Sequence, residues 1–262
     1  MLDAATLDHA PAAPATVAGE ARADDPARGD MVAADARADA ERLRRAAGCY
    51  GEMARSAACW AHPSWLAVPL GLTPEAAARL QQALAAGPRE SAHAVSAALL
   101  RHCRVGPAPL PALFARGPRG AAASAALLCL VPPAPRLRML CVRALLGHAD
   151  ELRRLVDRPA RQRLAQAIGM PLAEFVSRAG GALQRAPTHA VAACGADALA
   201  AAGYAALVAE RAPPGRFAAL ALPCDDVLAA RAAGAARARS SLGAAWAALL
   251  PELFPEWSWL FG

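Results

Sequence analysis

Two Cys–His pairs are the residues of this chain best suited to metal chemistry. His62 follows Cys59 by three positions, and His102 directly precedes Cys103. Together they would supply the four nitrogen and sulfur donors of a structural zinc site. Neither pair has the spacing of a zinc finger with a matching partner pair, so we interpret them as buried thiols and hydrogen-bonded histidines. We therefore expect no metal and no cofactor.

Signatures of catalysis are missing from the sequence. We find no G-x-S-x-G nucleophile turn, no phosphate-binding glycine loop, no dinucleotide fingerprint and no H-E-x-x-H. Asp225 and Asp226 form an acidic pair, but after Pro223 such a pair is more typical of a helix start than of a metal site. His148 lies on the apolar stripe of a predicted helix, where a satisfied core histidine is commoner than a ligand. We predict a protein that is not an enzyme.

The element that organises the rest is a predicted helix from Pro135 to Arg158. Prolines before it mark its start, because proline fits the first helical turn, and Pro159 marks its end. At 3.6 residues per turn it would have about six turns. Its residues divide into two faces. The apolar face contains Leu137, Cys141, Ala144, Leu145, His148, Leu152, Leu155 and Val156, and the outer face Arg136, Arg143, Asp150, Arg153, Arg154 and Asp157.

Three arginines of the outer face fall within about 20° of one line on the helical wheel. They are Arg136, Arg143 and Arg154, and we predict that they contact an acidic surface on a partner. An ordinary solvated face is the plainer interpretation. A helical nucleic-acid-binding regulator that uses the same arginines is the functional alternative.

Charge is unevenly distributed along the 262 residues, whose net charge is +6. All 28 basic residues are arginine, and residues 1–41 hold nine acids against three arginines. The remainder therefore carries 25 arginines and 13 acids, a net charge of +12. Seven cysteines without regular spacing indicate reduced thiols in the cytosol. We see no secretory signal, and the longest stretch without an acid, an arginine or a histidine, 16 residues between Arg119 and Arg136, is too short to span a bilayer.

The predicted fold class is mainly α, a single multi-helix globular domain over residues 31–262 with at most one short strand pair. Residues 1–30 are rich in alanine, proline and acids, and we expect them to be a disordered tail. Arg216–Leu222 is compatible with a strand or a helix. Turn residues bound the other predicted helices. These cover Met31–Cys59, Thr73–Gly87, Ser91–Arg104, Arg161–Ile168, Pro171–Ala179, Asp197–Arg211 and Asp225–Leu250.

Large aromatic residues mark two further positions. Trp65 lies in the helix break before the Thr73 helix, and we predict that it is a structural anchor of that turn. Trp257 and Trp259 stand near the carboxyl end with Phe254 and Phe261. This cluster either closes the core or anchors a partner, and we include both tryptophans among the predicted interface residues.

Four segments resemble a known family, and the resemblance extends from Cys59 to the carboxyl end. They are WAHPSWL at Trp60–Leu66, the stretch Arg136–Gly169, ALAAAGYAALVAE at Ala198–Glu210 and RFAALALP at Arg216–Pro223. In these segments the chain resembles type III secretion accessory proteins of the SctK group, which includes YscK and its Hrp-type counterparts.

The resemblance implies a cytoplasmic, non-enzymatic component of the injectisome sorting platform. It would lie at the inner membrane, without inserting into it, at the base of the secretion machine. As an adaptor it would join the cytoplasmic domain of the SctD-type ring protein to the SctQ-type pod that leads to the ATPase. The family has no catalytic residues, and neither a cofactor nor nucleic acid is implied as a partner.

Overall fold

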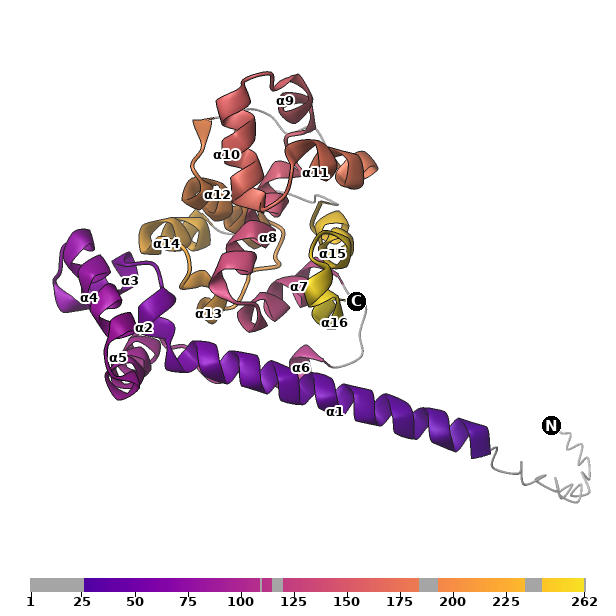
Figure 1. Ribbon diagram of the computed structural model, residues 1–262, viewed down its shortest axis with the longest axis horizontal. Helices are drawn as coiled ribbons and strands as arrows, with labels where there is room; N and C mark the ends of the chain where they lie inside the picture. Colours follow the sequence, from indigo (N-terminus) through magenta and orange to yellow (C-terminus); the bar gives the residue numbers. More distant parts are fainter. Residues whose placement is uncertain (1–25, 109, 115–119, 184–192, 234–241, 262) are drawn as a thin grey trace, which may run out of the picture. The chain divides into compact units, whose positions relative to one another are not determined.

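The computed structural model describes residues 26–108, 110–114, 120–183, 193–233 and 242–261 (Figure 1). The chain divides into two compact units, Met1–Asp39 and Ala40–Gly262. Helix α1, Pro26–Arg55, begins in the first unit and ends in the second. All of the other described helices belong to the second unit, which also contains every residue singled out as a candidate site.

Every regular element in these ranges is a helix, and none is a strand, which confirms the mainly α prediction. Three short 3-10 helices are η1 (Leu128–Leu130), η2 (Gly180–Ala182) and η4 (Pro255–Trp257). The α-helices after α1 are α2 (Ala57–Trp60), α3 (Ser64–Leu70), α4 (Pro74–Ala86), α5 (Arg89–His102), α6 (Leu110–Leu113), α7 (Ala121–Leu127), α8 (Pro133–Leu145), α9 (Ala149–Arg154), α10 (Arg158–Ile168), α11 (Leu172–Ala179), α12 (Ala196–Ala209), α13 (Arg216–Ala219), α14 (Cys224–Ala233), α15 (Leu242–Leu253) and α16 (Ser258–Phe261).

Local sequence signals explain several helix ends. Thr73 caps α4, because its side-chain oxygen accepts a hydrogen bond from the backbone N–H of Ala76 at 3.2 Å. Pro74 occupies the first turn of the same helix, as predicted. Helix α10 ends at Gly169, whose φ of 76° is a left-handed conformation that glycine adopts without strain. These helix ends are thus determined by interactions among residues that are close together in the sequence.

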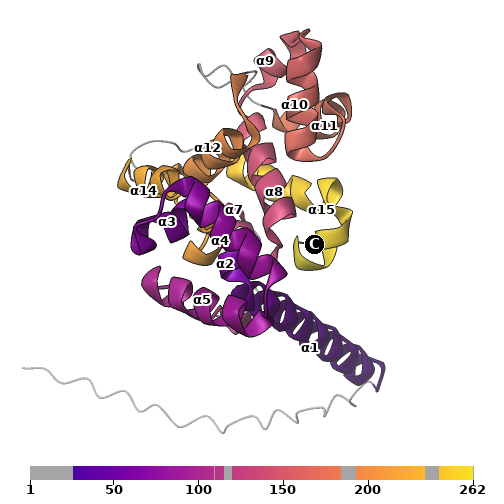
Figure 2. The same ribbon diagram turned by 60° about the vertical axis from the view of Figure 1, so that its left-hand side comes forward.

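The core is built around the pair α8 and α12, which pack along each other (Figures 1 and 2). A Cβ atom on Gly203 of α12 would lie 1.9 Å from the backbone oxygen of Leu140, so only glycine permits this approach. Trp246 of α15 is fully buried, and its indole N–H donates to the Met139 oxygen at 2.9 Å. Helices α10, α12 and α15 therefore enclose α8 from different directions.

The predicted six-turn helix Pro135–Arg158 is wrong as a single element. Helix α8 ends at Leu145, a turn that contains Gly147 follows, and α9 runs only from Ala149 to Arg154. Glycine has a low helix propensity, so Gly147 favours an end of the helix at this point. Leu146, in the same turn, is fully buried. Pro159 does not end a helix but lies in the first turn of α10, where proline is equally well tolerated.

Other boundaries differ from the predictions in informative ways. Arg216–Leu222 is not a strand, because its first residues form the helical turn α13. The predicted helix Asp225–Leu250 is two helices, α14 and α15, and residues 234–241 lie outside the described part. Residues 1–25 of the predicted tail also lie outside it, and α1 already includes residues 26–30.

Candidate interaction surfaces

Arg136 is not on the outer face, as predicted, but is fully buried. Its Nε and Nη2 donate to the Val131 oxygen at 3.0 and 2.6 Å, and its Nη1 donates to the oxygens of Phe217 and Ala218 at 3.4 and 3.3 Å. The guanidinium also lies 5.0 Å from the centroid of the Trp60 ring, a cation–π geometry. Loss of solvent lowers the pKa of Arg136 to about 10, so it remains charged near neutral pH. Arg136 therefore links α8 to the turn before it and to α13.

Arg143 is the second correction to the predicted arginine row. Its Nη2 lies 2.5 Å from Oε1 of Glu210, and both side chains are only 5% exposed. The pair joins α8 to the end of α12 inside the core. Because a buried charge without a counter-charge is strongly unfavourable, each member of the pair needs the other.

Arg154 is exposed, but it belongs to α9 rather than to the helix that carries the other two arginines. The three residues therefore do not form a common surface. The helical wheel placed them on one line because it describes a single straight helix, and it contains no information about neighbouring helices. Of the three, only Arg154 stays a predicted interface residue.

Trp65 lies on α3 and is half-buried. Its indole N–H donates to the backbone oxygen of Leu222 at 2.8 Å, 157 positions away in the sequence. The neighbouring Ser64 hydroxyl accepts a hydrogen bond from the backbone N–H of Cys224 at 2.8 Å. These contacts join α3 to the chain that enters α14. Trp65 lies on a helix and not in the predicted helix break, and its role as a structural anchor stays a prediction.

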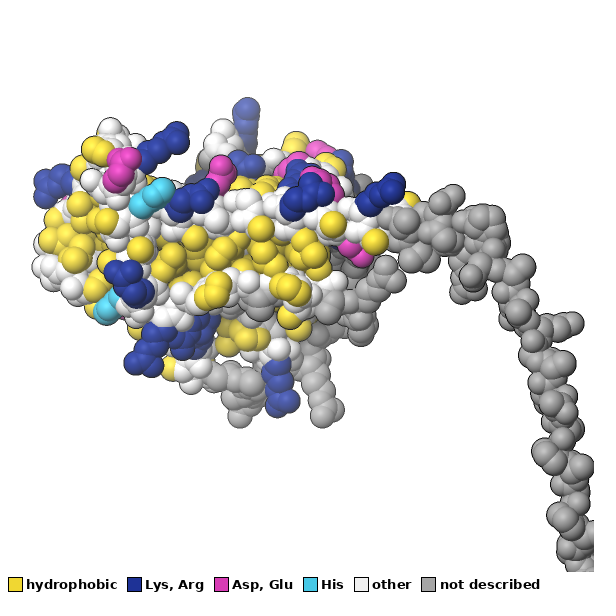
Figure 3. All heavy atoms as spheres, turned by 90° about the horizontal axis from the view of Figure 1, so that it is seen from below, with side chains coloured by type: hydrophobic (Ala, Val, Ile, Leu, Met, Phe, Trp, Pro, Cys, Tyr) yellow, Lys and Arg dark blue, Asp and Glu magenta, His cyan; other side chains and the backbone are white. Residues whose placement is uncertain are grey.

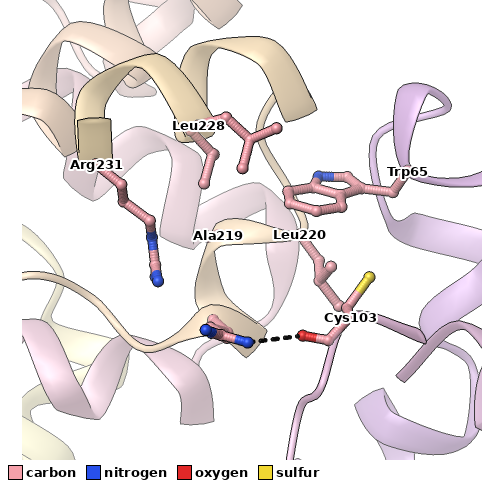
Figure 4. A pocket seen from close by; sticks show the side chains of 8 residues that line it. Trp65, Cys103, Ala219, Leu220, Leu228 and Arg231 are labelled. Carbon is pink, nitrogen blue, oxygen red and sulfur yellow. Dashed lines mark hydrogen bonds between the residues drawn. The ribbon is translucent and has the colours of Figure 1, made fainter. Parts of the chain in front are cut away.

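A cleft opens beside Trp65, between α3 and α14, and we call it the α3–α14 cleft (Figure 4). Its volume is about 200 Å³. Arg216 lines the cleft, and its Nη1 donates a hydrogen bond to the Cys103 oxygen at 3.4 Å. Arg231 donates from Nε to the Tyr204 hydroxyl at 2.7 Å. The residues that line the cleft include Trp65, Cys103, Arg216, Leu220, Leu228 and Arg231.

Three large exposed apolar side chains belong to the two helices that flank this cleft, and one of them, Leu228, lines it. Four such residues occur in the described part of the chain. Leu228 of α14 is 55% exposed, and Val68 and Leu70 of α3 are 70% and 51% exposed. The fourth, Val156, is 89% exposed and lies between α9 and α10. No sequence signal distinguishes these residues from core leucines and valines, so sequence reasoning missed this surface.

The carboxyl-terminal aromatic residues divide between core and surface. Phe254 and Phe261 are buried, whereas Trp257 and Trp259 are only half-buried, with ring centroids 6.3 Å apart. The Arg45 guanidinium of α1 lies 4.3 Å from the centroid of the Trp259 ring. The cluster thus closes part of the core and also leaves two tryptophans at the surface. A partner role for Trp257 and Trp259 stays a prediction.

A further apolar region surrounds Tyr50, whose hydroxyl donates to the Gly106 oxygen at 2.8 Å. Burial raises the pKa of Tyr50 to about 12, so the phenol stays neutral at physiological pH. Val105, Leu113 and Phe217 line an open recess next to it. Figure 3 shows apolar side chains gathered over the face seen from below, with arginine side chains around them.

Two of the histidines considered as possible ligands lie close to polar side chains of nearby residues. His62 Nδ1 lies 2.8 Å from the Ser64 hydroxyl, and His148 Nδ1 lies 3.5 Å from Oε2 of Glu151. Burial raises the pKa of the Cys129 thiol to about 11 and that of the Cys141 thiol to about 12, so both stay protonated. Among the residues that the structure describes, no three His, Cys, Asp or Glu side chains are grouped to hold a metal ion.

None of the helices in the described ranges combines the length and apolar character needed to cross a bilayer. Comparison with protein families finds a match over residues 34–256 to the HrpB4 family, described as a bacterial type III secretion protein. Searches of curated proteins and of solved structures found no match.

Proposed function

The chain belongs to the HrpB4 family of bacterial type III secretion proteins, and from this we propose that it is a non-enzymatic adaptor of the injectisome sorting platform. In this role it joins the cytoplasmic domain of the SctD-type inner-membrane ring protein to the SctQ-type pod. It works in the cytoplasm, peripheral to the inner membrane at the base of the machine. The family match, which covers residues 34–256, is the observation that carries the proposal.

The arrangement of the second unit supports an adaptor role, because an adaptor needs two separate contact surfaces. In both views α3 and α14 lie on one side of α8, and α15 and α16 lie on the other (Figures 1 and 2). The first side carries the α3–α14 cleft with its exposed apolar side chains. The second carries Trp257 and Trp259, and tryptophan is among the residues that contribute most to protein interfaces. Two partners can thus bind without competing for one surface.

The nucleic-acid-binding alternative relied on an arginine face to which Arg136 and Arg143 contribute nothing, because both are buried. Association of Arg154 with an acidic partner remains part of the proposal, because its side chain is exposed. An exposed charge at the rim of an interface acts mainly on the rate of association and on specificity.

The test of the adaptor function is reconstitution from purified proteins. The full chain is mixed with the ring protein's cytoplasmic domain, with the pod protein, and with both together, and the mixtures are analysed by size-exclusion chromatography with light scattering. We expect both binary complexes and one ternary complex. Failure to bind either protein, or binding of the two in competition with each other, would contradict the proposal.

Variants then test the predicted interface residues. Trp257→Ser and Arg154→Glu should each weaken binding to one partner without lowering the melting temperature, since neither side chain is fully buried. Arg89→Glu, an exposed charge reversal at the start of α5, is the matched control for Arg154→Glu. Equal affinities of Arg154→Glu and Arg89→Glu for both partners would show that Arg154 only faces solvent.

A further inference from the structure

We propose that the α3–α14 cleft and its apolar rim bind a helix from another protein of the secretion machine, apolar on one face and acidic beside it. The inference rests on the proposed function, because it assumes that the chain has protein partners within that machine. It adds where one partner binds and which chemistry the partner presents. The argument depends on the rim, the size of the cleft, its charges and the fold around it.

The rim shows that this surface is adapted to an apolar partner. Three of the four large exposed apolar residues in the described ranges, Val68, Leu70 and Leu228, belong to the two helices that flank the cleft. Trp65 and Val68 are three positions apart on α3 and therefore share a face, whereas Leu70 is about 140° away from Trp65 on the helical wheel, so the rim consists of Leu228 and Val68. Grouped apolar exposure of this kind marks an interaction site, whereas single exposed apolar residues are ordinary.

The size of the cleft indicates that it receives a side chain rather than a small molecule. Small-molecule sites usually enclose roughly 300 to 1,000 Å³. The α3–α14 cleft encloses about 200 Å³ and is bounded by the Trp65 ring, Leu220 and Leu228 (Figure 4). The Trp65 indole N–H already has its partner in Leu222, which leaves the apolar ring for contact with an incoming side chain.

The charges around the cleft select an acidic partner. Arg216 and Arg231 line the cleft, and neither forms an ion pair with a carboxylate in the described part of the chain. On the helical wheel of α14, Asp226 points about 160° away from Leu228, whereas Asp225 is three positions before Leu228 and only about 60° away, which sets one carboxylate near the cleft against its two arginines. An acidic group beside an apolar anchor would therefore meet two arginines.

The fold determines which form of segment can bind. A strand could add itself only to a sheet edge, and the described residues contain no strand. Helix α3, through Trp65, and helix α14, through Val227 and Leu228, instead flank a cleft that Ala219 and Leu220 also line. This is the geometry in which an amphipathic helix binds through side chains spaced three and four residues apart.

Four variants of the full chain test the inference by measuring affinity for the ring protein's cytoplasmic domain and for the pod protein. Leu228→Glu places a negative charge on the apolar rim, and Val156→Glu makes the same change at the remote exposed position. Arg216→Glu reverses a charge of the cleft, and Arg158→Glu is its exposed control at the start of α10. A fifth variant, Val68→Glu on the opposite helix, is measured as well, and its affinity alone decides if Leu228→Glu does not fold.

We expect Leu228→Glu to weaken binding to one of the two proteins at least about tenfold and to leave binding to the other unchanged. Arg216→Glu should weaken the same interaction at low salt, with a smaller effect at high salt, because salt screens exposed charges. Both control variants should stay within about twofold of the unchanged protein. If Leu228→Glu and Val68→Glu both bind the two proteins as the unchanged chain does, the inference fails while the adaptor function stands.

A photo-crosslinking amino acid placed at position 228, and in a control at position 156, then identifies the bound segment. The expected crosslink from position 228 joins an acidic helical segment of the protein whose affinity the variants reduce. A crosslink to a second copy of this chain, or to a basic or non-helical segment, would overturn the inference. If the unchanged chain binds neither protein, the proposed adaptor function itself fails. This outcome differs from failure of the inference, in which the unchanged chain and the cleft variants bind both proteins equally well.

Discussion

The buried pair Arg143–Glu210 offers the sharpest test of how this core is assembled. The perturbation is a cycle of three variants: Arg143→Met, Glu210→Met and the double variant. Methionine keeps much of the length of both side chains and removes the charge. The two wild-type groups approach to 2.5 Å with both side chains 5% exposed, so neither has solvent to replace a lost partner.

The expected magnitudes follow from this burial. Each single variant leaves one charge buried and uncompensated, and such changes lower the free energy of unfolding by about 3–5 kcal/mol. The double variant removes both charges, and replacement of a buried pair by apolar groups is often close to neutral. The coupling energy between the two positions should therefore be several kcal/mol, far above the roughly 0.3–0.5 kcal/mol within which independent sites add.

Urea unfolding followed by circular dichroism measures the three free energies on the full chain. With a slope of about 1–3 kcal/mol per molar urea, each single variant should lower the midpoint by 1 M or more, about the shift that a loss of 3 kcal/mol produces. Arg154→Glu, exposed on α9, is the control and should change the stability by less than about 0.5 kcal/mol. If the changes in free energy of unfolding of the two single variants add up to that of the double variant, Arg143 and Glu210 do not interact as a buried ion pair. The same conclusion would follow if the single variants were as stable as the unchanged protein.

Three further changes test other parts of the structure by the same unfolding assay. Gly203→Ala should lower stability by at least about 3 kcal/mol because α8 and α12 would have to separate, whereas Gly48→Ala, with no atom within 4 Å of the new methyl group, should be neutral or stabilising by up to about 1 kcal/mol; equal effects would contradict the close packing. Trp65→Phe should cost about 1 kcal/mol through loss of the hydrogen bond to Leu222, and an unchanged midpoint would show that this bond contributes nothing. Burial raises the pKa of the Cys129 thiol to about 11, so its contribution to stability is present below the unfolded pKa near 8.5 and is lost as the pH rises towards 11. The Cys129→Ala variant should therefore lose less stability than the unchanged protein between these two pH values. Identical dependence of stability on pH in the two proteins would contradict this.

Local features of the helices could be predicted from the sequence because the chemistry that determines them lies within a few residues. Thr73 and Pro74 start a helix wherever they occur in such a context, and Gly169 ends one. The resemblance of four segments to the SctK group agreed with the type III secretion family that matches the chain. The mainly α class followed from the succession of predicted helices that turn residues bound.

The candidate site could be predicted only in part. Trp65 was predicted to be an anchor because a large aromatic residue in a helix break needs something to pack against, but Trp65 lies on α3 and not in a break. The α3–α14 cleft was not recognised, because Leu228 lies 163 positions after Trp65 and no short-range pattern connects them. An exposed leucine and a buried leucine look alike in a sequence whose hydrophobic residues amount to 56%.

Short-range signals in the sequence thus determined the ends of several helices and the mainly α class of the chain, whose described part contains no strand. Tertiary structure alone decided which residues face solvent. The wheel placed Arg136 and Arg143 opposite the apolar stripe, yet α8 is enclosed by several helices, so residues on that side are buried as well. Such burial is tolerable only because partners distant in the sequence, the Phe217 and Ala218 carbonyls and the Glu210 carboxylate, satisfy the two guanidinium groups. A sequence pattern describes the faces of a single helix, whereas only the folded structure shows which other helices pack against each face.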